Sequence, residues 1–571
     1  MRFLLLATDY DGTLATDGRV DAPTLAAMDR LRASGRKLVL VTGRHLPDLQ
    51  TVFPKLELFD RVVVENGALL YRPATREEKL LCEGPHQKFV ALLHDRNVPV
   101  AVGRCIVSTW QPHDVEVLEV IKDLGLDLQV IFNKGAVMVL PSGVNKGSGL
   151  KAALGDLGLS AHNVVSVGDA ENDHSFLRIS ECAAAVANAL PALKERADVV
   201  LDRPRGAGVT ELVDRLIEDD LAEFDSRLQR HWISLGQRVS DSSEPVLFSP
   251  CGGGILVAGP SASGKSTAVA GILEQLLGHE YQFCLLDPEG DYDDFSGALS
   301  FGTAREPPDV KAILRALESP GQSVIVNLLG VPLDDRPGFS GSLLSSIQEL
   351  RLRSARPHWL VMDEAHHLLP SSWSPMKPTV SHVLESAILI TVHPEHVPRA
   401  ALDHVNAVVA MGKDALKTIG AFSSATEIAP PQGEDVELDT GEALVWLRTS
   451  SEPPVQVKTA RSTQERRRHV RLYAEGELSE QQSFYFRGPE AKLNLRAQNL
   501  KTFVQIAEGV DDATWIYHLR RGEYSAWFRL VIKDSELADL TSAIERGSDS
   551  CPQESREGIK KAIRERYTAP A

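Results

Sequence analysis

Short apolar runs rich in β-branched residues alternate with helical patterns in two separate blocks of this chain. The first block covers residues 1–218 and the second covers about 246–450. The runs are 38–41, 62–64 and 164–167 in the first block, and 255–258, 324–326, 359–362 and 388–390 in the second. Such alternation is typical of parallel sheets with crossover helices, whose functional residues follow the carboxyl ends of the strands. The sequence therefore predicts a multidomain α/β protein.

Length and composition limit the number of domains and the location of the protein. A chain of 571 residues is too long for one core, which predicts three or four domains. The net charge of −17 argues against a nucleic-acid surface over the whole protein, although a local basic groove stays open. Six cysteines without C-x-x-C spacing favour free thiols in a reducing compartment. The apolar start is too short for a signal peptide and no stretch approaches ~18 apolar residues, so we expect a cytoplasmic protein without membrane contact.

Two aspartates follow the first apolar run and open a candidate phosphate-transfer site. Asp9 and Asp11 are two residues apart, so strand alternation points them the same way, and Gly12 permits a tight turn. Two neighbouring carboxylates suit a division of labour. One attacks phosphorus as a nucleophile, and the other, if protonated, donates to the leaving oxygen.

Three later segments supply the other groups that phosphate transfer needs. Thr42, Gly43 and Arg44 end the next strand and offer a hydroxyl and backbone N–H groups. Lys146 can neutralise phosphate charge, and the segment 168–173 ends another strand with carboxylates suited to magnesium. An isolated Asp-x-Asp-Gly also fits a hydrophilic turn, but four such segments in order at strand ends favour a site.

These segments resemble the four motifs of the haloacid dehalogenase (HAD) superfamily of phosphatases, particularly the Cof-type (IIB) branch, over residues 1 to about 215. The segments 65–68 and 185–189 also match that branch. The resemblance implies that Asp9 forms an aspartyl-phosphate and that Asp11 is the general acid and then the base. A degraded phosphatase is the alternative, although no essential motif residue is missing.

The same resemblance implies the phosphate and metal ligands and the domain boundaries. The phosphoryl group would be bound by Thr42, Gly43, Lys146 and Asn172. Magnesium would be bound by Asp9, Asp169 and the backbone carbonyl of Asp11, with Asp173 in support. The core would comprise 1–72 and 143–218, with an inserted α/β cap at 73–142 that selects the substrate.

A glycine-rich loop follows an apolar run at the start of the second block. Gly259-x4-Gly264-Lys265-Ser266 has the phosphate-binding loop pattern, in which backbone N–H groups at a helix start hold the β-phosphate. Lys265 would reach the β- and γ-phosphates, and Ser266 would bind magnesium. The candidate nucleotide-binding residues are Gly259, Ser261, Ala262, Ser263, Gly264, Lys265, Ser266 and Thr267.

An acidic pair ends another apolar run of the second block. Asp363 would hold magnesium through water, and Glu364 would polarise the attacking water as a catalytic residue. Such a pair alone is also a common helix cap after a strand, but its combination with the loop favours nucleotide hydrolysis.

The segments 287–292 and 363–370 resemble the HerA/FtsK class of P-loop ATPases, especially its HerA-like members, over residues 246–455. That family implies a RecA-like sheet, often a hexameric ring, and DNA pumping. Two departures stand out: the barrel that usually precedes this core is replaced by the phosphatase, and 391–393 (Thr-Val-His) stands where a polar sensor is expected. Arg399 is only a guess for a trans-acting arginine, and His366 with its neighbour fits packing better than metal binding.

The remaining segments give weaker signals. Residues 219–245 are charged and polar and predict a helix followed by a linker. Residues 466–571 predict a small, mainly helical C-terminal domain that vaguely resembles a domain of unknown function. Its interleaved aromatics and arginines suit either nucleic-acid stacking or, as the favoured interpretation, a helical core.

Three functions are consistent with these patterns. The leading one is a bifunctional enzyme: a magnesium-dependent phosphatase of a small phosphorylated metabolite, such as a sugar phosphate, fused to an ATP-binding and ATP-hydrolysing domain that regulates or oligomerises it. The second is a nucleic-acid-processing or antiviral ATPase machine in which the first domain dephosphorylates nucleic-acid ends; nucleic acid is thus an open but disfavoured partner. The third is a small-molecule kinase joined to an opposing phosphatase.

Overall fold

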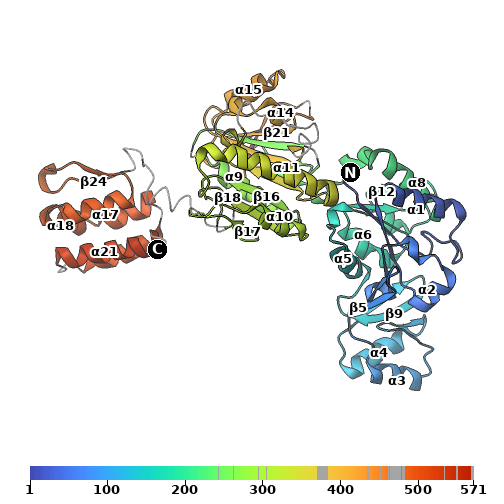
Figure 1. Cartoon of the computed structure of the whole chain (residues 1–571). Coiled ribbons are helices and arrows are strands. Elements are labelled where there is room, and N and C mark those ends of the chain that lie inside the picture. Colours follow the sequence, from blue (N-terminus) through green and yellow to red (C-terminus); the bar gives the residue numbers. More distant parts are fainter. Residues whose placement is uncertain are drawn as a thin grey trace. The chain divides into compact units, whose positions relative to one another are not determined.

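The computed structural model describes most of the chain. The described residues are 1–241, 244–251, 253–261, 263–293, 295–303, 305–369, 384–433, 436–450, 452–460, 462, 478, 483–532, 534–547 and 551–567. Contacts divide the chain into two compact units (Figure 1). The first unit comprises Met1–Gly290 and Gly297–Thr463, and the second comprises Asp291–Ser296 and Gln464–Ala571. Within the described ranges, no helix combines the length and apolar character needed to cross a bilayer.

The first large sheet has eight strands in the order β12-β11-β10-β1-β2-β3-β4-β5. The strands are β1 (Leu5–Thr8), β2 (Lys37–Val41), β3 (Arg61–Val64), β4 (Leu69–Arg72), β5 (Glu77–Leu80), β10 (Val164–Gly168), β11 (Cys182–Ala185) and β12 (Val199–Val200). The six from β12 to β3 are parallel, and β4 and β5 are antiparallel. Strands β1 and β10 are buried along their whole length, as expected of a sheet covered on both faces.

Helices complete this α/β core, and the predicted Rossmann-like fold of the N-terminal part is confirmed. The helices are α1 (Ala22–Ala33), α2 (Leu46–Val52), α5 (Lys146–Leu157), α6 (His174–Ile179), α7 (Pro191–Lys194) and α8 (Arg205–Asp219). Apolar residues of α1, α5, α6 and α8 share one core with the strands. Asn145 caps α5, because its side chain accepts the backbone N–H groups of Gly147 and Ser148 and thereby fixes where the helix begins.

A smaller antiparallel sheet is inserted in the core, in the order β6-β7-β9-β8. Its elements are α3 (Gln87–Asp95), β6 (Ala101–Val102), β7 (Val107–Trp110), α4 (Asp114–Leu124), β8 (Leu128–Asn133) and β9 (Ala136–Pro141). Apolar residues of α3 and α4 pack with those of β7 and β9 in a core of their own. Strand β5, which falls inside the expected insertion 73–142, pairs with β4 in the large sheet.

The second large sheet has eleven strands in the order β14-β13-β23-β22-β21-β15-β20-β19-β16-β18-β17. These are β13 (Ile233–Arg238), β14 (Pro245–Phe248), β15 (Gly254–Ala258), β16 (Phe283–Asp287), β17 (Ala298–Phe301), β18 (Ser323–Asn327), β19 (Trp359–Met362), β20 (Ala387–Thr391), β21 (Val405–Ala410), β22 (Glu442–Leu447) and β23 (Val455–Lys458). The strands from β21 to β17 are parallel, and the others are antiparallel.

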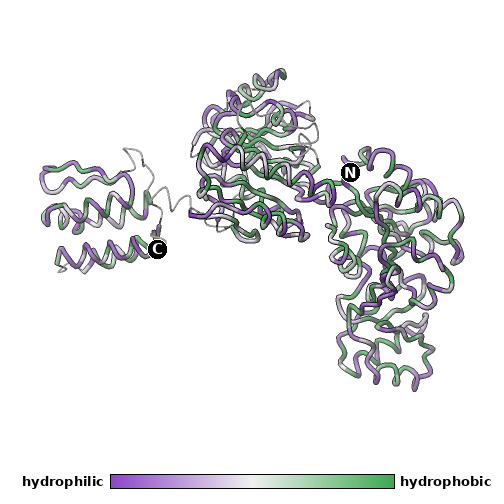
Figure 2. Tube along the Cα trace, viewed as in Figure 1, coloured by the Kyte–Doolittle hydropathy of each residue, from purple (hydrophilic) through white to green (hydrophobic). Residues whose placement is uncertain are grey.

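Hydrophobic residues follow the strands inside the sheets (Figure 2). The helices of the second block are α9 (Lys265–Gly278), α10 (Val310–Glu318), α11 (Arg336–Ser354), α12 (Ala365–Leu368), α14 (Arg399–Leu402) and α15 (Ala415–Thr426). Apolar residues of α10, α11 and α15 pack with the parallel strands in one core. The range 219–245, expected to be a helix and linker, contains strand β13, which pairs with β23 of this sheet.

The second unit is mainly helical around an aromatic core. Its elements are β24 (Phe484–Phe486), β25 (Leu495–Ala497), α17 (Leu500–Gly509), α18 (Asp512–Arg520), α19 (Glu523–Trp527), α20 (Ser535–Arg546) and α21 (Pro552–Tyr567). Trp515 and Tyr524 stack with ring centroids 4.5 Å apart, and Phe503 and Trp527 are buried in the same cluster. These rings are therefore packed inside the unit, not presented for base stacking. Residues 466–477 of the expected domain lie outside the described residues.

Candidate functional site

Three of the predicted site residues lie at one edge of the first sheet, each directly after a parallel strand. Asp9 follows β1, Thr42 follows β2, and Asp169 follows β10, and these three strands are neighbours in the sheet. Because the carboxyl ends of neighbouring parallel strands meet at the same edge, residues far apart in sequence come together there. The Asp9 backbone N–H extends the pairing by donating to the Val167 oxygen.

Lys146 bridges two of these carboxylates inside the protein. Its Nζ lies 2.5 Å from Asp9 Oδ1 and 2.6 Å from Asp173 Oδ1, and all three side chains are buried. Burial opposes a charged lysine, but Asp173 and Asp9 outweigh it and raise the pKa of Lys146. Burial also raises the pKa of Asp9 to about 7, against the lowering effect of Lys146. The lysine is thus a fixed cation at the place where a phosphoryl group would approach Asp9.

The carboxylates around Lys146 fit a hard divalent cation. Oxygen atoms of Asp9, Asp169 and Asp173 lie within 4.8 Å of one another and are buried. Asp173 is oriented by the backbone N–H groups of Asp169 (2.8 Å) and Ala170 (2.9 Å), both of which donate to Oδ2. An all-oxygen set of this kind is what magnesium prefers. Of the predicted metal ligands, the structure therefore brings these three together.

Asp11, the expected general acid, is held by an arginine. Arg44 donates from Nε and Nη2 to the two oxygens of Asp11 at 2.6 and 2.7 Å, and from Nη1 to Asp48 at 2.6 Å. The hydrogen bond to Asp11 is the largest cause of a raised pKa at Arg44. About half of the Asp11 side chain is exposed to solvent.

The predicted phosphate-binding residues lie around the same edge. Thr42 Oγ1 accepts the backbone N–H of Arg44 at 3.2 Å, which shapes the turn after β2. Asn172 Nδ2 donates to Asn66 Oδ1 at 3.1 Å. A Cβ added to Gly43 would lie 3.6 Å from Met138 of the inserted sheet, so this turn faces the insertion.

Gly12 has to be a glycine in this arrangement. Its φ is +89°, a conformation that L side chains rarely adopt. A Cβ would also come within 2.4 Å of Asp169 Oδ2 and 3.0 Å of Lys134 Nζ. The sequence Asp-x-Asp-Gly predicted a tight turn here. The close approach of the Asp169 carboxylate explains why that turn needs a glycine.

The inserted sheet contributes a lysine that sequence reasoning missed. Lys134 lies in the turn between β8 and β9, and its Nζ is 2.8 Å from Asp169 Oδ2. Burial lowers the pKa of Lys134, but the carboxylates near it, chiefly Asp169, together raise it by more, so the net pKa is raised. A Lys-Gly turn carries no sequence signal for this role, since only the folding of the insertion over the core brings it to Asp169.

Glu65 links the core to the segment between β6 and β7 of the inserted sheet. Its carboxylate accepts the backbone N–H groups of Arg104 (2.9 Å), Cys105 (2.8 Å) and Ile106 (3.2 Å). Burial raises its pKa, but His45 and the backbone donors more than offset that, and the net pKa is lowered. A buried carboxylate with this many donors holds the inserted sheet at a defined place over the site.

The glycine-rich loop of the second block connects β15 to α9. Lys265, the first residue of α9, donates from Nζ to the carbonyl oxygens of Gly259 (2.9 Å) and Pro260 (3.0 Å). Ser261, Ser263, Gly264, Ser266 and Thr267 lie on this loop and the first helical turn, whereas Ala262 lies outside the described residues.

The acidic pair of the second block follows β19, at the carboxyl edge that also carries the glycine-rich loop. Strand β20 lies between β15 and β19. The backbone oxygen of its last residue, Thr391, accepts a hydrogen bond from the backbone N–H of Gly259 at 3.4 Å. His366 Nδ1 is 3.0 Å from Thr391 Oγ1 and 3.5 Å from Glu364 Oε2, and burial lowers the pKa of His366 to about 4. His366 is thus a hydrogen-bonding group beside Glu364. Arg399, the arginine considered for a trans-acting role, forms an ion pair in which its Nη1 lies 2.5 Å from Glu427 Oε2.

Comparison with known proteins identifies the family of the N-terminal part of the chain. Residues 6–105 and 116–213 match the family described as haloacid dehalogenase-like hydrolase. A phosphoglycolate phosphatase of Pyrobaculum aerophilum is 34% identical over 222 residues, which cover 37% of this chain and 95% of the relative. The chain belongs to the haloacid dehalogenase-like hydrolases.

One further relative and one solved structure each match a similar share of this chain. Phosphoglycolate phosphatase 2 of Saccharolobus solfataricus is 30% identical over 226 residues, 38% of this chain and 95% of the relative. A solved haloacid dehalogenase-like hydrolase from B. subtilis is 19% identical, covers 38% of this chain and all of its own, and has a TM-score of 0.33. The family match and the two phosphoglycolate phosphatases confirm the predicted phosphatase domain, and the N-terminal part of the chain is a HAD phosphatase.

The raised pKa of Asp9 predicts a pH dependence of phosphatase activity. Because the nucleophile must be ionised, protonation of Asp9 below about pH 7 should lower kcat/KM for p-nitrophenyl phosphate, by about tenfold per pH unit. Added Mg²⁺ should move this acidic limb to lower pH, since a nearby cation favours the carboxylate. Initial rates from pH 4 to 8 at several Mg²⁺ concentrations check this. The prediction would be contradicted if the acidic limb had an apparent pKa of ~3.9, the value of an ordinary aspartate, at every Mg²⁺ concentration.

Proposed function

We propose that the N-terminal domain hydrolyses a small phosphomonoester through a phosphorylated Asp9. The observation that carries this proposal is the buried contact of Lys146 with Asp9 and Asp173. Asp9 attacks phosphorus, the bond from phosphorus to the leaving oxygen breaks, and Asp11 gives that oxygen a proton. Water then attacks the phosphorus of the aspartyl-phosphate while Asp11 takes a proton from that water. The bond from phosphorus to the Asp9 oxygen breaks, which releases inorganic phosphate and restores the Asp9 carboxylate.

The surrounding residues orient the phosphoryl group during both steps. Lys146 Nζ, the Thr42 hydroxyl and the turn at Gly43 are placed to bind its oxygens. Magnesium would be held by Asp9, Asp169 and the Asp11 carbonyl with Asp173 in support, and when bound it neutralises phosphoryl charge. Asp11 can donate its proton only after Arg44 releases it, so substrate binding has to compete for that guanidinium.

The cations at the mouth of the site support a substrate that carries a carboxylate beside its phosphate. Arg44 contacts Asp11 and Lys134 contacts Asp169, and both are partly exposed. A substrate carboxylate can replace either aspartate as their partner, Arg44 by a bidentate contact. Together with relatives named phosphoglycolate phosphatase, this favours a small phosphorylated acid over the sugar phosphate expected from the sequence.

A substrate comparison tests this assignment. Purified protein with Mg²⁺ should hydrolyse phosphoglycolate with a kcat/KM at least about tenfold above that for glucose 6-phosphate, and Lys134→Ala should raise the KM for phosphoglycolate by about tenfold, the value of one charge-assisted hydrogen bond. Lys122→Ala, on the exposed face of α4, is the matched control and should leave both constants unchanged. Equal or faster hydrolysis of the sugar phosphate would overturn the substrate class.

We further propose that the second block binds and hydrolyses ATP at the loop between β15 and α9. The support is geometric: Lys265 begins a helix of 14 residues at the carboxyl edge of a parallel sheet, and Asp363 follows a strand at that edge. Backbone N–H groups at such a helix start, with the helix dipole, favour phosphate. Asp363 and Ser266 would hold magnesium, and Glu364 would orient the attacking water.

Lys265→Ala should abolish this nucleotide binding. The substitution removes the cation that faces the β- and γ-phosphates, so a fluorescent ATP analogue should bind at least about a hundredfold more weakly. Lys311→Ala, exposed on α10, is the control and should bind normally. Unchanged binding by Lys265→Ala would refute the site. Phosphatase rates of the same variants with and without ATP test the regulatory role, and ATPase rates with and without DNA test the nucleic-acid alternative. Transfer of labelled γ-phosphate from ATP to a small acceptor instead of water would indicate the kinase alternative.

A further inference from the structure

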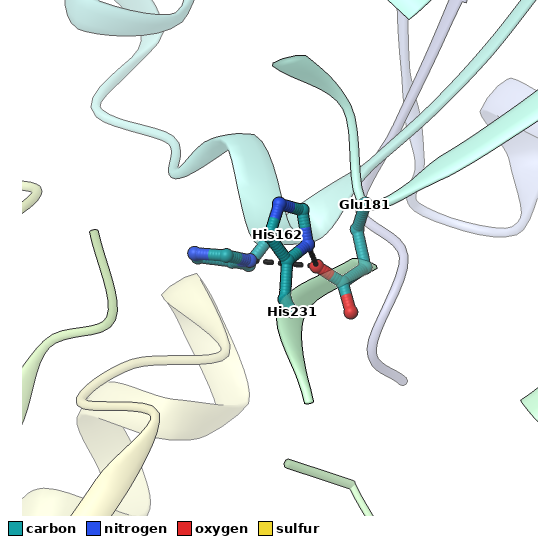
Figure 3. A group of neighbouring side chains, drawn as sticks. All are labelled: His162, Glu181 and His231. Atoms are coloured by element: carbon teal, nitrogen blue, oxygen red, sulfur yellow. Dashed lines mark hydrogen bonds and ion pairs between the residues drawn. The ribbon is translucent and has the colours of Figure 1, made fainter. Parts of the chain in front are cut away.

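Two histidines and a glutamate form a cluster outside both sites. His162 lies on the 3-10 turn Ala161–Asn163, Glu181 directly precedes β11, and His231 ends the 3-10 turn Gln229–His231. The Nδ1 atoms of the histidines lie 2.6 Å (His162) and 2.8 Å (His231) from the same oxygen, Glu181 Oε2 (Figure 3). One ligand-capable atom from each residue lies within 4.8 Å of the others.

The hydrogen-bond partners of His162 call for a cation in this cluster. Its Nε2 is 2.7 Å from the backbone oxygen of His279, which can only accept, so Nε2 carries a hydrogen. Its Nδ1 then faces a carboxylate oxygen at 2.6 Å. Two lone pairs repel at that distance, so either a second proton or a metal ion has to lie between them.

The neighbours of the cluster hold its members in orientations that suit metal binding. The His162–His279 contact is the kind that metal-binding histidines make through their second nitrogen. The other oxygen of Glu181 accepts from Arg2 Nη2 at 2.5 Å, and the Tyr281 hydroxyl lies 3.3 Å from that oxygen and 3.4 Å from Oε2. Tyr281 also stacks on the His162 ring with centroids 3.7 Å apart. Oε2 therefore stays directed at the two imidazoles.

A cleft beside the cluster gives solvent access to it. The cleft has a volume of about 180 Å³, and its lining includes His162, His231, His279, Lys151 and Arg178. His162 and Glu181 are buried, whereas His231 keeps partial exposure. Water or a small anion can therefore reach the histidine side of the cluster.

We propose that His162 Nδ1, His231 Nδ1 and Glu181 Oε2 bind one divalent transition metal of the zinc type, with a water from the cleft as a further ligand. Two imidazoles and a carboxylate with one open position are a ligand set that zinc accepts. Bonds of about 2.0–2.2 Å at tetrahedral angles place the ligand atoms roughly 3.3–3.6 Å apart. Metal binding therefore requires both histidine nitrogens, now 2.6 and 2.8 Å from Glu181 Oε2, to move away from it by roughly 0.5–1 Å, through adjustment of the short turns that carry His162 and His231. The all-oxygen phosphatase site prefers magnesium, so the two sites select different ions.

Cobalt titration of the full chain tests this site. Protein stripped with a chelator and kept in excess Mg²⁺ should bind one equivalent of Co²⁺ with a visible absorption band, release it to Zn²⁺, and unfold at a higher temperature with Zn²⁺. His231→Gln should bind Co²⁺ about tenfold or more weakly. His94→Gln, exposed on α3, is the matched control and should bind normally.

Two outcomes would overturn the proposal. Absence of stoichiometric Co²⁺ binding, or equal binding by His231→Gln with an unchanged far-UV spectrum, would show that protons alone hold the cluster together. Loss of the band in Asp169→Asn, with retention in His231→Gln, would place the ion in the phosphatase site instead.

Discussion

The buried contact of Lys146 with Asp9 and Asp173 is the interaction on which the proposed phosphatase site depends. Buried charges are tolerated only when they are paired and hydrogen-bonded, and here Lys146 pairs with two buried carboxylates while Lys134 pairs with the third, Asp169. The Asn145 cap fixes the start of α5 and so the position of that lysine. The neighbouring strands β10, β1 and β2 bring the acids to it. Removal of the lysine would leave like charges facing one another without water.

Much of this arrangement could be predicted from sequence because it follows strand ends. The apolar runs indicated a parallel sheet, and the polar residues directly after them, such as Asp9 and Asp169, had to meet at one edge. Lys134 and the pairing of Arg44 with Asp11 could not be predicted in this way. They depend on how the inserted sheet lies over the core and on which partner a flexible side chain selects. Strand β13 was missed because its polar sequence, Ile-Ser-Leu-Gly-Gln-Arg, matches a linker as well as an edge-region strand.

The second sheet follows the same physical rule as the first. Its glycine-rich loop and its acidic pair follow parallel strands and share the carboxyl edge, with Thr391 between them. The two blocks also meet within one compact unit, since His279 and Tyr281 of the second block contact His162 and Glu181 of the first.

The most direct test of the central claim is to locate the phosphoryl group during turnover. Protein mixed with phosphoglycolate and Mg²⁺, quenched in acid within a turnover and treated with borohydride, should show reduction at a single acyl-phosphate, and peptide mass spectrometry should place it at Asp9. Asp9→Asn should show neither the modification nor turnover. Steady turnover with no modified Asp9, or with a phosphoryl group on another residue, would contradict the account.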